Sequence, residues 1–194
     1  MATNVTAAEI AAGEGVLRKL GQEVGLPQAM DRLIDFRNEN RPGSNPRYWA
    51  AVNFDLHSAV PRLFLFDRQA QGVTSYLCAH GKGSEGPKDD GYAEIFSNAD
   101  GSNCTCLGIF RTGQTYYGEH GYSLYLHGLE ATNFNAFHRH IVMHPADYVT
   151  PAFAKKHGRI GRSLGCPAVE PQHARRIIDA LRGGSLLIHW KSGA

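Results

Sequence analysis

Short segments rich in aromatic and β-branched residues, each bounded by turn-forming residues, dominate this chain from residue 48 onward. Segments of this length and composition are typical of strands rather than helices. Glycine is frequent, with 22 of 194 residues, which favours tight turns. The predicted strands are Tyr48–Asp55, Arg62–Asp67, Gly72–Cys78, Cys106–Thr112, Tyr122–Leu126, Arg139–His144 and Ser185–Trp190. Because helices do not alternate with them, the pattern predicts a mainly β, mostly antiparallel domain and not a βαβ fold.

Helical periodicity occurs near both ends of the chain. Thr6–Leu20 and Pro27–Asn38 carry helical spacing, and the Pro- and Gly-containing segment 41–46 that follows is a clear break. We therefore predict a helical N-terminal extension at 1–45 and a main domain at 46–194. A short helix is predicted at Tyr148–His157. The late helix is the clearest, because its apolar positions recur at i, i+3, i+4 and i+7: Ala174, Ile177, Ile178 and Leu181.

Charge and hydropathy exclude several functional classes. The net charge is only +2, and the basic residues are scattered, which argues against a nucleic-acid partner. No apolar run reaches the roughly 18 residues of a membrane span. Met1–Glu14 lacks the features of a signal peptide, and we favour a mature exported protein without its leader over a cytosolic one. The cysteines form neither a disulfide framework nor a zinc ribbon, which favours free thiols: Cys78, Cys104, Cys106 and Cys166.

The glycine-punctuated loop 158–167 carries the residue with the most chemical potential, Cys166. A thiol is a useful nucleophile when its thiolate is populated, and Arg159 and Arg162 supply positive charge nearby in sequence. Gly165 would let the backbone approach a substrate carbonyl, and the amides of residues 164–166 could stabilise an oxyanion. A core cysteine is the alternative, but core cysteines usually have apolar neighbours. The loop therefore favours a catalytic Cys166.

His144 is the candidate base, because it ends an apolar predicted strand from which it could reach the loop. No Asp or Glu stands out as a third member of a triad. A backbone carbonyl is therefore the expected partner that orients the imidazole. Together Cys166 and His144 predict an acyl-transfer enzyme with a covalent intermediate.

Four segments in this order make the prediction more specific: 107–124 with Thr-Tyr-Tyr-Gly at 115–118, then 127–130, 141–144 and 161–168. Over about residues 47–190 the chain resembles the murein L,D-transpeptidase catalytic domain family, in its YkuD-like branch. The chain differs from the family pattern in having Pro145 after His144, and His127 where an Asp is expected.

The resemblance implies a YkuD-like β-sandwich or barrel with a late helix. It also implies a catalytic group in which Ser163 and Gly165 frame the nucleophile Cys166 and the base His144. The expected substrate-binding residues are Tyr117, His80, Lys82, Arg159, Arg162 and His127. No metal or cofactor is required by this chemistry.

The resemblance further implies a peptidoglycan substrate in the periplasm or cell envelope. A Cys166 thioester would link the attack on an L–D junction of a donor stem peptide to transfer onto an acceptor stem peptide or a D-amino acid. Cross-linking at the third stem residue (3–3) is favoured, and cross-linking at the first (1–3) stays open. Transfer to water would instead give a carboxypeptidase or endopeptidase, and a secreted antibacterial effector could use the same chemistry.

Two other classes remain as alternatives. His138 and His140 would share one face of a strand that ends at His144, a spacing that suits a zinc hydrolase. A non-catalytic cell-wall binding domain could retain the fold, and it would tolerate the loss of Cys166. A zinc hydrolase would be inhibited by chelators, whereas a thiol enzyme would be inactivated by alkylating agents.

Overall fold

The computed structural model describes residues 7–40 and 47–194, so the predicted break at 41–46 and Thr6 lie outside the described residues. The helices are α1 (Ala7–Glu23), α2 (Pro27–Asn40), α3 (Pro151–His157) and α4 (Pro171–Leu181), with a 3-10 turn η1 (Lys82–Ser84). The strands are β1 (Tyr48–Asn53), β2 (Leu63–Asp67), β3 (Gly72–Tyr76), β4 (Gly108–Gly118), β5 (Gly121–Gly128), β6 (Val142–Pro145), β7 (Ala168–Val169) and β8 (Leu186–Trp190).

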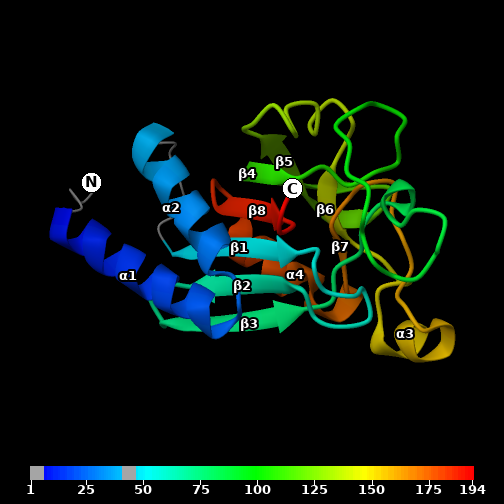
Figure 1. Ribbon diagram of the computed structural model, residues 1–194, viewed down its shortest axis with the longest axis horizontal. Helices are drawn as coiled ribbons and strands as arrows, with labels where there is room; N and C mark the ends of the chain where they lie inside the picture. The colour runs from blue at the N-terminus through cyan, green and yellow to red at the C-terminus, as the bar shows by residue number, and fades with distance from the viewer. Residues whose placement is uncertain (1–6, 41–46) are drawn as a thin grey trace.

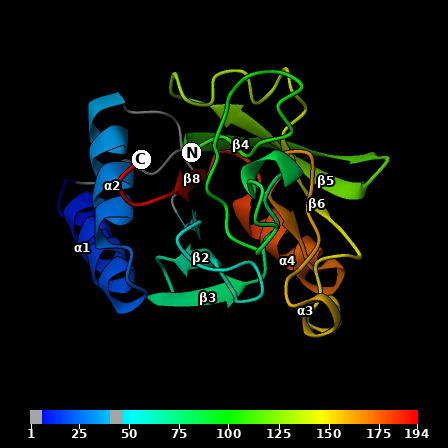
Figure 2. The same ribbon diagram turned by 45° about the vertical axis from the view of Figure 1, so that its right-hand side comes forward.

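The eight strands form one sheet in the order β3-β2-β1-β8-β4-β5-β6-β7. Neighbouring strands are antiparallel except for the pairs β1–β8 and β6–β7. The apolar face of α4 packs into a core to which all eight strands contribute side chains. Such a core requires the sheet to curve around the helix, and Figures 1 and 2 show α4 between the β1–β3 side and the β5–β6 side. The predicted mainly β, mostly antiparallel fold with a late helix is confirmed.

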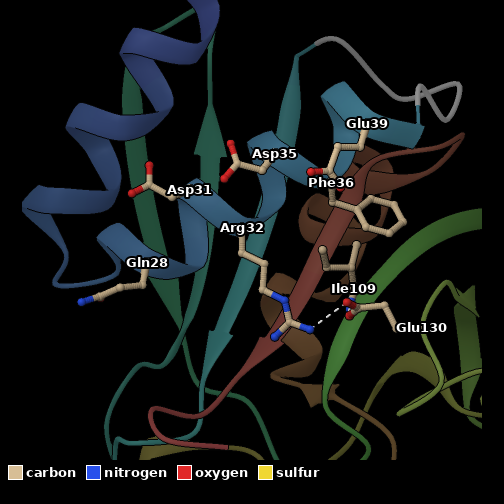
Figure 3. Close-up of a pocket in the computed structure, with 8 residues that line it drawn as sticks. All are labelled: Gln28, Asp31, Arg32, Asp35, Phe36, Glu39, Ile109 and Glu130. Carbon is tan, nitrogen blue, oxygen red and sulfur yellow. Dashed lines mark hydrogen bonds and ion pairs between the residues drawn. The ribbon is translucent and has the colours of Figure 1, made fainter.

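The helices α1 and α2 cover the opposite face of the sheet, over β2, β1, β8 and β4 (Figure 1). Leu17 and Leu33 are buried there against Trp49 and Ile188. On the rim of a separate pocket between α2 and the start of β4, Arg32 makes an ion pair with Glu130 at 2.7 Å (Figure 3). Division of the chain at residues 45 and 46 stays a prediction, although these helices share a continuous core with the strands.

Element boundaries differ from the predicted ones where loops and twists intervene. β4 continues to Gly118, past a register shift between Thr112 and Thr115. The strand predicted at Arg139–His144 begins only at Val142, because residues 130–140 form a series of turns that ends with His140 at φ +53°. Within residues 7–40 and 47–194, no helix is long and apolar enough to cross a membrane.

Candidate active site

The Cys166 loop is joined at Ser163 to the segment that leads into η1. The backbone of Ser163 pairs with that of His80 and Lys82, since Ser163 N–H donates to His80 O at 2.9 Å and Lys82 N–H donates to Ser163 O at 2.8 Å. The Ser163 hydroxyl donates to the Cys166 carbonyl at 2.7 Å and accepts from the Gly165 amide at 3.1 Å. Ser163 therefore shapes the turn that presents Cys166.

Gly165 is required by the packing of this turn. Its φ of +126° is unfavourable for other residues. A Cβ atom there would lie 2.7 Å from the Cys104 carbonyl oxygen and 2.8 Å from Ile141 Cδ1. Its amide is bound to Ser163, which corrects the prediction that it serves an oxyanion. In the described part of the chain the amides of Leu164 and Cys166 make no hydrogen bond, so two of the three expected donors remain available.

Cys166 is half-buried, whereas the other three cysteines are buried, and all four are free thiols. Its Sγ donates to the His140 carbonyl and accepts from the Val142 amide, both at 3.5 Å. Burial raises the pKa of the Cys166 thiol, while the Val142 N–H and the charge of Arg139 lower it. The positive charge that favours the thiolate therefore comes from Arg139.

Arg139 was not predicted in this role. Its guanidinium donates to the Ser97 carbonyl at 2.9 Å and to the Cys104 carbonyl at 2.8 Å, with a longer bond to the Ser102 hydroxyl. These bonds hold it beneath the turn of Gly165. The contact could not be predicted from the sequence, because Arg139 and Cys166 lie in different loops.

Arg159 and Arg162 do not supply that charge, which corrects the prediction made from their position in the loop. Arg162 Nη1 binds Glu85 Oε2 at 2.5 Å and also contacts Asp89. Arg159 binds Asp89 at 2.9 Å and lies 3.5 Å from Glu85. Glu85 is fully buried, so both arginines hold segment 80–91 against the Cys166 loop.

His80, which was predicted to bind substrate, instead lies beneath the same loop with no exposed surface. Its Nδ1 lies 2.6 Å from Nη2 of Arg62, which is also fully buried. Burial, with the charge of Arg62, lowers the pKa of His80 to about 3. The ring is therefore neutral and supports the backbone that pairs with Ser163.

His144 lies on β6, where it pairs with Ala168 of β7, two residues after Cys166. Its Nδ1 is 2.9 Å from the Pro145 carbonyl, which makes Nδ1 the protonated nitrogen and leaves the Nε2 lone pair free. The predicted contact between a backbone carbonyl and the His144 imidazole is confirmed. Burial lowers the pKa of His144. In the described residues no hydrogen bond joins His144 to Cys166, whose thiol is turned towards His140.

A comparison with protein families decides what this arrangement belongs to. The sequence model of the L,D-transpeptidase catalytic domain (YkuD_2) matches residues 23–190. The chain belongs to the L,D-transpeptidase catalytic domain family.

Solved structures that match are L,D-transpeptidases or related proteins of low identity. An L,D-transpeptidase from Mycobacterium smegmatis is 13% identical, with a TM-score of 0.44 over 75% of this chain and 59% of that one. The helical cell shape determining protein Pgp2 from Campylobacter jejuni is 10% identical, with a TM-score of 0.45 over 79% of this chain and 49% of that one. This chain thus covers less than two thirds of the length of each of these two proteins. No curated protein matches the chain significantly.

The remaining predicted substrate residues of this L,D-transpeptidase domain lie at different places around the loop. Lys82 is exposed next to Ser163. His127 is exposed on β5, and its ring stacks on Phe137 at 4.9 Å. Tyr117 is 72% exposed at the end of β4, and its hydroxyl accepts from Arg175 of α4 at 2.8 Å. These three can meet a substrate, whereas His80 cannot.

Two tyrosines near Cys166 were not predicted as site residues. Burial raises the pKa of Tyr148 to about 12, and the next contribution comes from Cys166. Burial also raises the pKa of Tyr116, to which Cys166 adds, and the Tyr116 ring stacks on Tyr125 at 4.3 Å. The Thr-Tyr-Tyr-Gly stretch pointed to Tyr117, and its other tyrosine, Tyr116, was not predicted as a site residue.

The geometry behind the zinc alternative is not present. His138 and His140 lie on the turns before β6 and not on a strand. Among the residues that the structure describes, no group of three or more His, Cys, Asp and Glu side chains is arranged to hold a metal ion.

Proposed function

We propose that this chain is a cysteine-dependent peptidoglycan L,D-transpeptidase in which Cys166 is the nucleophile and His144 the base. Family membership supports the reaction class. The observation that carries the residue assignment is the placement of Cys166: it is the one half-buried cysteine, on a turn fixed by Ser163 and Gly165 beside the strand of His144.

In the first half-reaction the Cys166 thiol turns from the His140 carbonyl towards His144 and transfers its proton to Nε2. The sulfur attacks the carbonyl carbon of an L-residue that is joined to a D-residue in the donor stem peptide. The free amides of Leu164 and Cys166 are the donors on this turn for the resulting oxyanion. The C–S bond forms as the C–N bond breaks, and the imidazolium of His144 protonates the leaving amine.

In the second half-reaction an acceptor amine gives its proton to His144 and attacks the thioester. The new C–N bond forms, the C–S bond breaks, and the proton returns to sulfur. We propose the third stem residue as the acyl donor, which gives a 3–3 cross-link, in the periplasm or cell envelope where peptidoglycan lies. Tyr117, Lys82, His127 and the exposed edges of Arg159 and Arg162 are the proposed substrate contacts.

The test compares wild type and Cys166→Ala on purified peptidoglycan fragments, with the products analysed by mass spectrometry. Cross-linked dimers or exchanged stems from wild type and none from Cys166→Ala are the expected result. Fragmentation identifies the L–D junction, and a 1–3 product would replace the proposed 3–3 specificity. Trimmed stems alone would make the protein a carboxypeptidase or endopeptidase.

Cys78→Ala is the matched control, because Cys78 is buried and has its pKa raised to about 12 by burial. It should retain full activity. Equal activity of wild type and Cys166→Ala would remove Cys166 as the nucleophile.

A further inference from the structure

The imidazole of His144 is covered on one side by a second imidazole. His120 lies in the turn between β4 and β5, and its ring stacks on that of His144 with 4.5 Å between centroids and 24° between planes. His120 is exposed, whereas His144 is only 3% exposed. The exposed ring thus shields the buried one.

The hairpin that carries His120 is fixed to α4 on both of its arms. Tyr117 on β4 accepts a hydrogen bond from Arg175, and Tyr122 on β5 donates to Asp179 at 2.6 Å. The Arg175 guanidinium also lies 4.7 Å from the centre of the Tyr122 ring. The position of His120 is therefore set by tertiary contacts of one residue on each arm of the hairpin, Tyr117 and Tyr122.

The rest of the surroundings of His144 includes a pocket with both polar and apolar walls. A pocket of about 480 Å³ is lined by His144 and His120, together with Glu119, Asp147 and Tyr148. In the described residues Glu119 and Asp147 make no ion pair. The titratable groups that line this pocket with His144 are thus His120 from the hairpin, the two carboxylates and Tyr148.

Burial and two neighbouring groups change the pKa of His144 in opposite directions. Burial lowers the pKa of His144, the Pro145 carbonyl raises it, and His120 lowers it again through repulsion between like charges. His120 is thus both a part of the cover over His144 and a group that opposes its protonation.

We propose that His120 is a positioning residue for the catalytic base: its stacked ring holds the His144 imidazole in the orientation that directs Nε2 to the reaction. This inference rests on the proposed role of His144. It gives a role to a residue that lies in segment 107–124 but was not among the predicted site residues.

The test uses His120→Phe, which keeps a stacking ring without charge, and His120→Ala, which removes both. The protonation of His144 is followed by NMR, with His144→Gln used to assign its signal, and the pH profile of cross-linking is measured in parallel. His120→Phe should move the His144 titration and the acid limb of activity to higher pH while retaining kcat at neutral pH. His120→Ala should also lower kcat, by up to about a hundredfold, because the ring loses its support.

His157→Phe is the matched control, since His157 is an exposed histidine on α3 that also packs against an aromatic ring, that of Phe153. It should change neither readout. An unchanged His144 titration in His120→Phe, with kcat unchanged in His120→Ala, would overturn the inference. Because the NMR titration needs no turnover, failure of the proposed function appears separately, as a wild type without peptidoglycan activity.

Discussion

A side-chain carbon at Gly165 would lie 2.7 Å from the carbonyl oxygen of Cys104, and Arg139 holds that same carbonyl at 2.8 Å. The turn before Cys166 is therefore closed against a carbonyl that a half-buried arginine fixes in place. Neither partner is near the other in sequence, and their contact determines where the Cys166 backbone runs.

Gly165→Ala should accordingly displace Cys166. The substitution combines an unfavourable φ of +126° with a clash against backbone, so we expect a loss of about 1–3 kcal/mol in unfolding free energy. Cross-linking should fall by about a hundredfold or more, because small displacements of a reacting atom are costly. Gly158→Ala is the control: Gly158 has a φ of +75° but nothing within 4 Å of the added carbon. Equal activity losses in both variants would contradict the clash as the cause.

Arg139 should control the reactivity of the Cys166 thiol. Its charge lowers the thiol pKa, so Arg139→Met should slow alkylation of Cys166 by iodoacetamide at pH 8 by roughly threefold to tenfold. Arg139→Lys should restore part of the rate by restoring the charge. Arg162→Met removes a loop arginine that binds Glu85 instead, and its alkylation rate should match wild type. If Arg162→Met slows alkylation more than Arg139→Met does, the charge that lowers the thiol pKa comes from the loop arginines instead.

Periodicity and turn residues were sufficient to predict seven of the eight strands, the late helix and the Cys166 loop, because each depends on a local pattern. The two-residue strand β7 was missed, and the strand predicted at Arg139–His144 begins only at Val142. The partner of His144 was also predictable, since no carboxylate was suitable and the carbonyl of Pro145 is adjacent. The roles of Arg139, His120 and Glu85 were not predictable. Each depends on segments far apart in sequence that the curved sheet brings together, and charge near Cys166 in the chain gave the wrong arginines. The burial of His80 was not predictable for the same reason, because it depends on contact with Arg62, which is 18 residues away in the sequence.

Activity should persist to lower pH than an ordinary histidine base would allow. Burial lowers the pKa of His144 below 6.5 and raises that of Cys166 above 9.0, so both groups are neutral at pH 7. His144 must be unprotonated to accept the thiol proton, and a lowered pKa keeps it so as the pH falls. The acid limb of kcat/KM should therefore lie below pH 6.5. An acid limb above pH 7 would contradict the assignment of this limb to His144. So would an acid limb that changes only in variants of residues far from His144.

Two buried histidines should make the fold sensitive to acid. Burial lowers the pKa of His80 to about 3 and that of His189 to about 4, so between these values and pH 6.5 the unfolded chain binds protons that the folded chain excludes. Stability is complete above pH 6.5 and falls as the pH decreases towards 4, by an amount on the order of a few kcal/mol. Urea unfolding at pH 7, 5.5 and 4.5 measures this loss. His189→Gln should be less stable at pH 7, because the ring packs against Phe54 and Phe110, yet lose less stability on acidification, whereas the exposed control His157→Gln should retain the wild-type dependence. A pH dependence that His189→Gln leaves unchanged would assign the acid sensitivity to other groups.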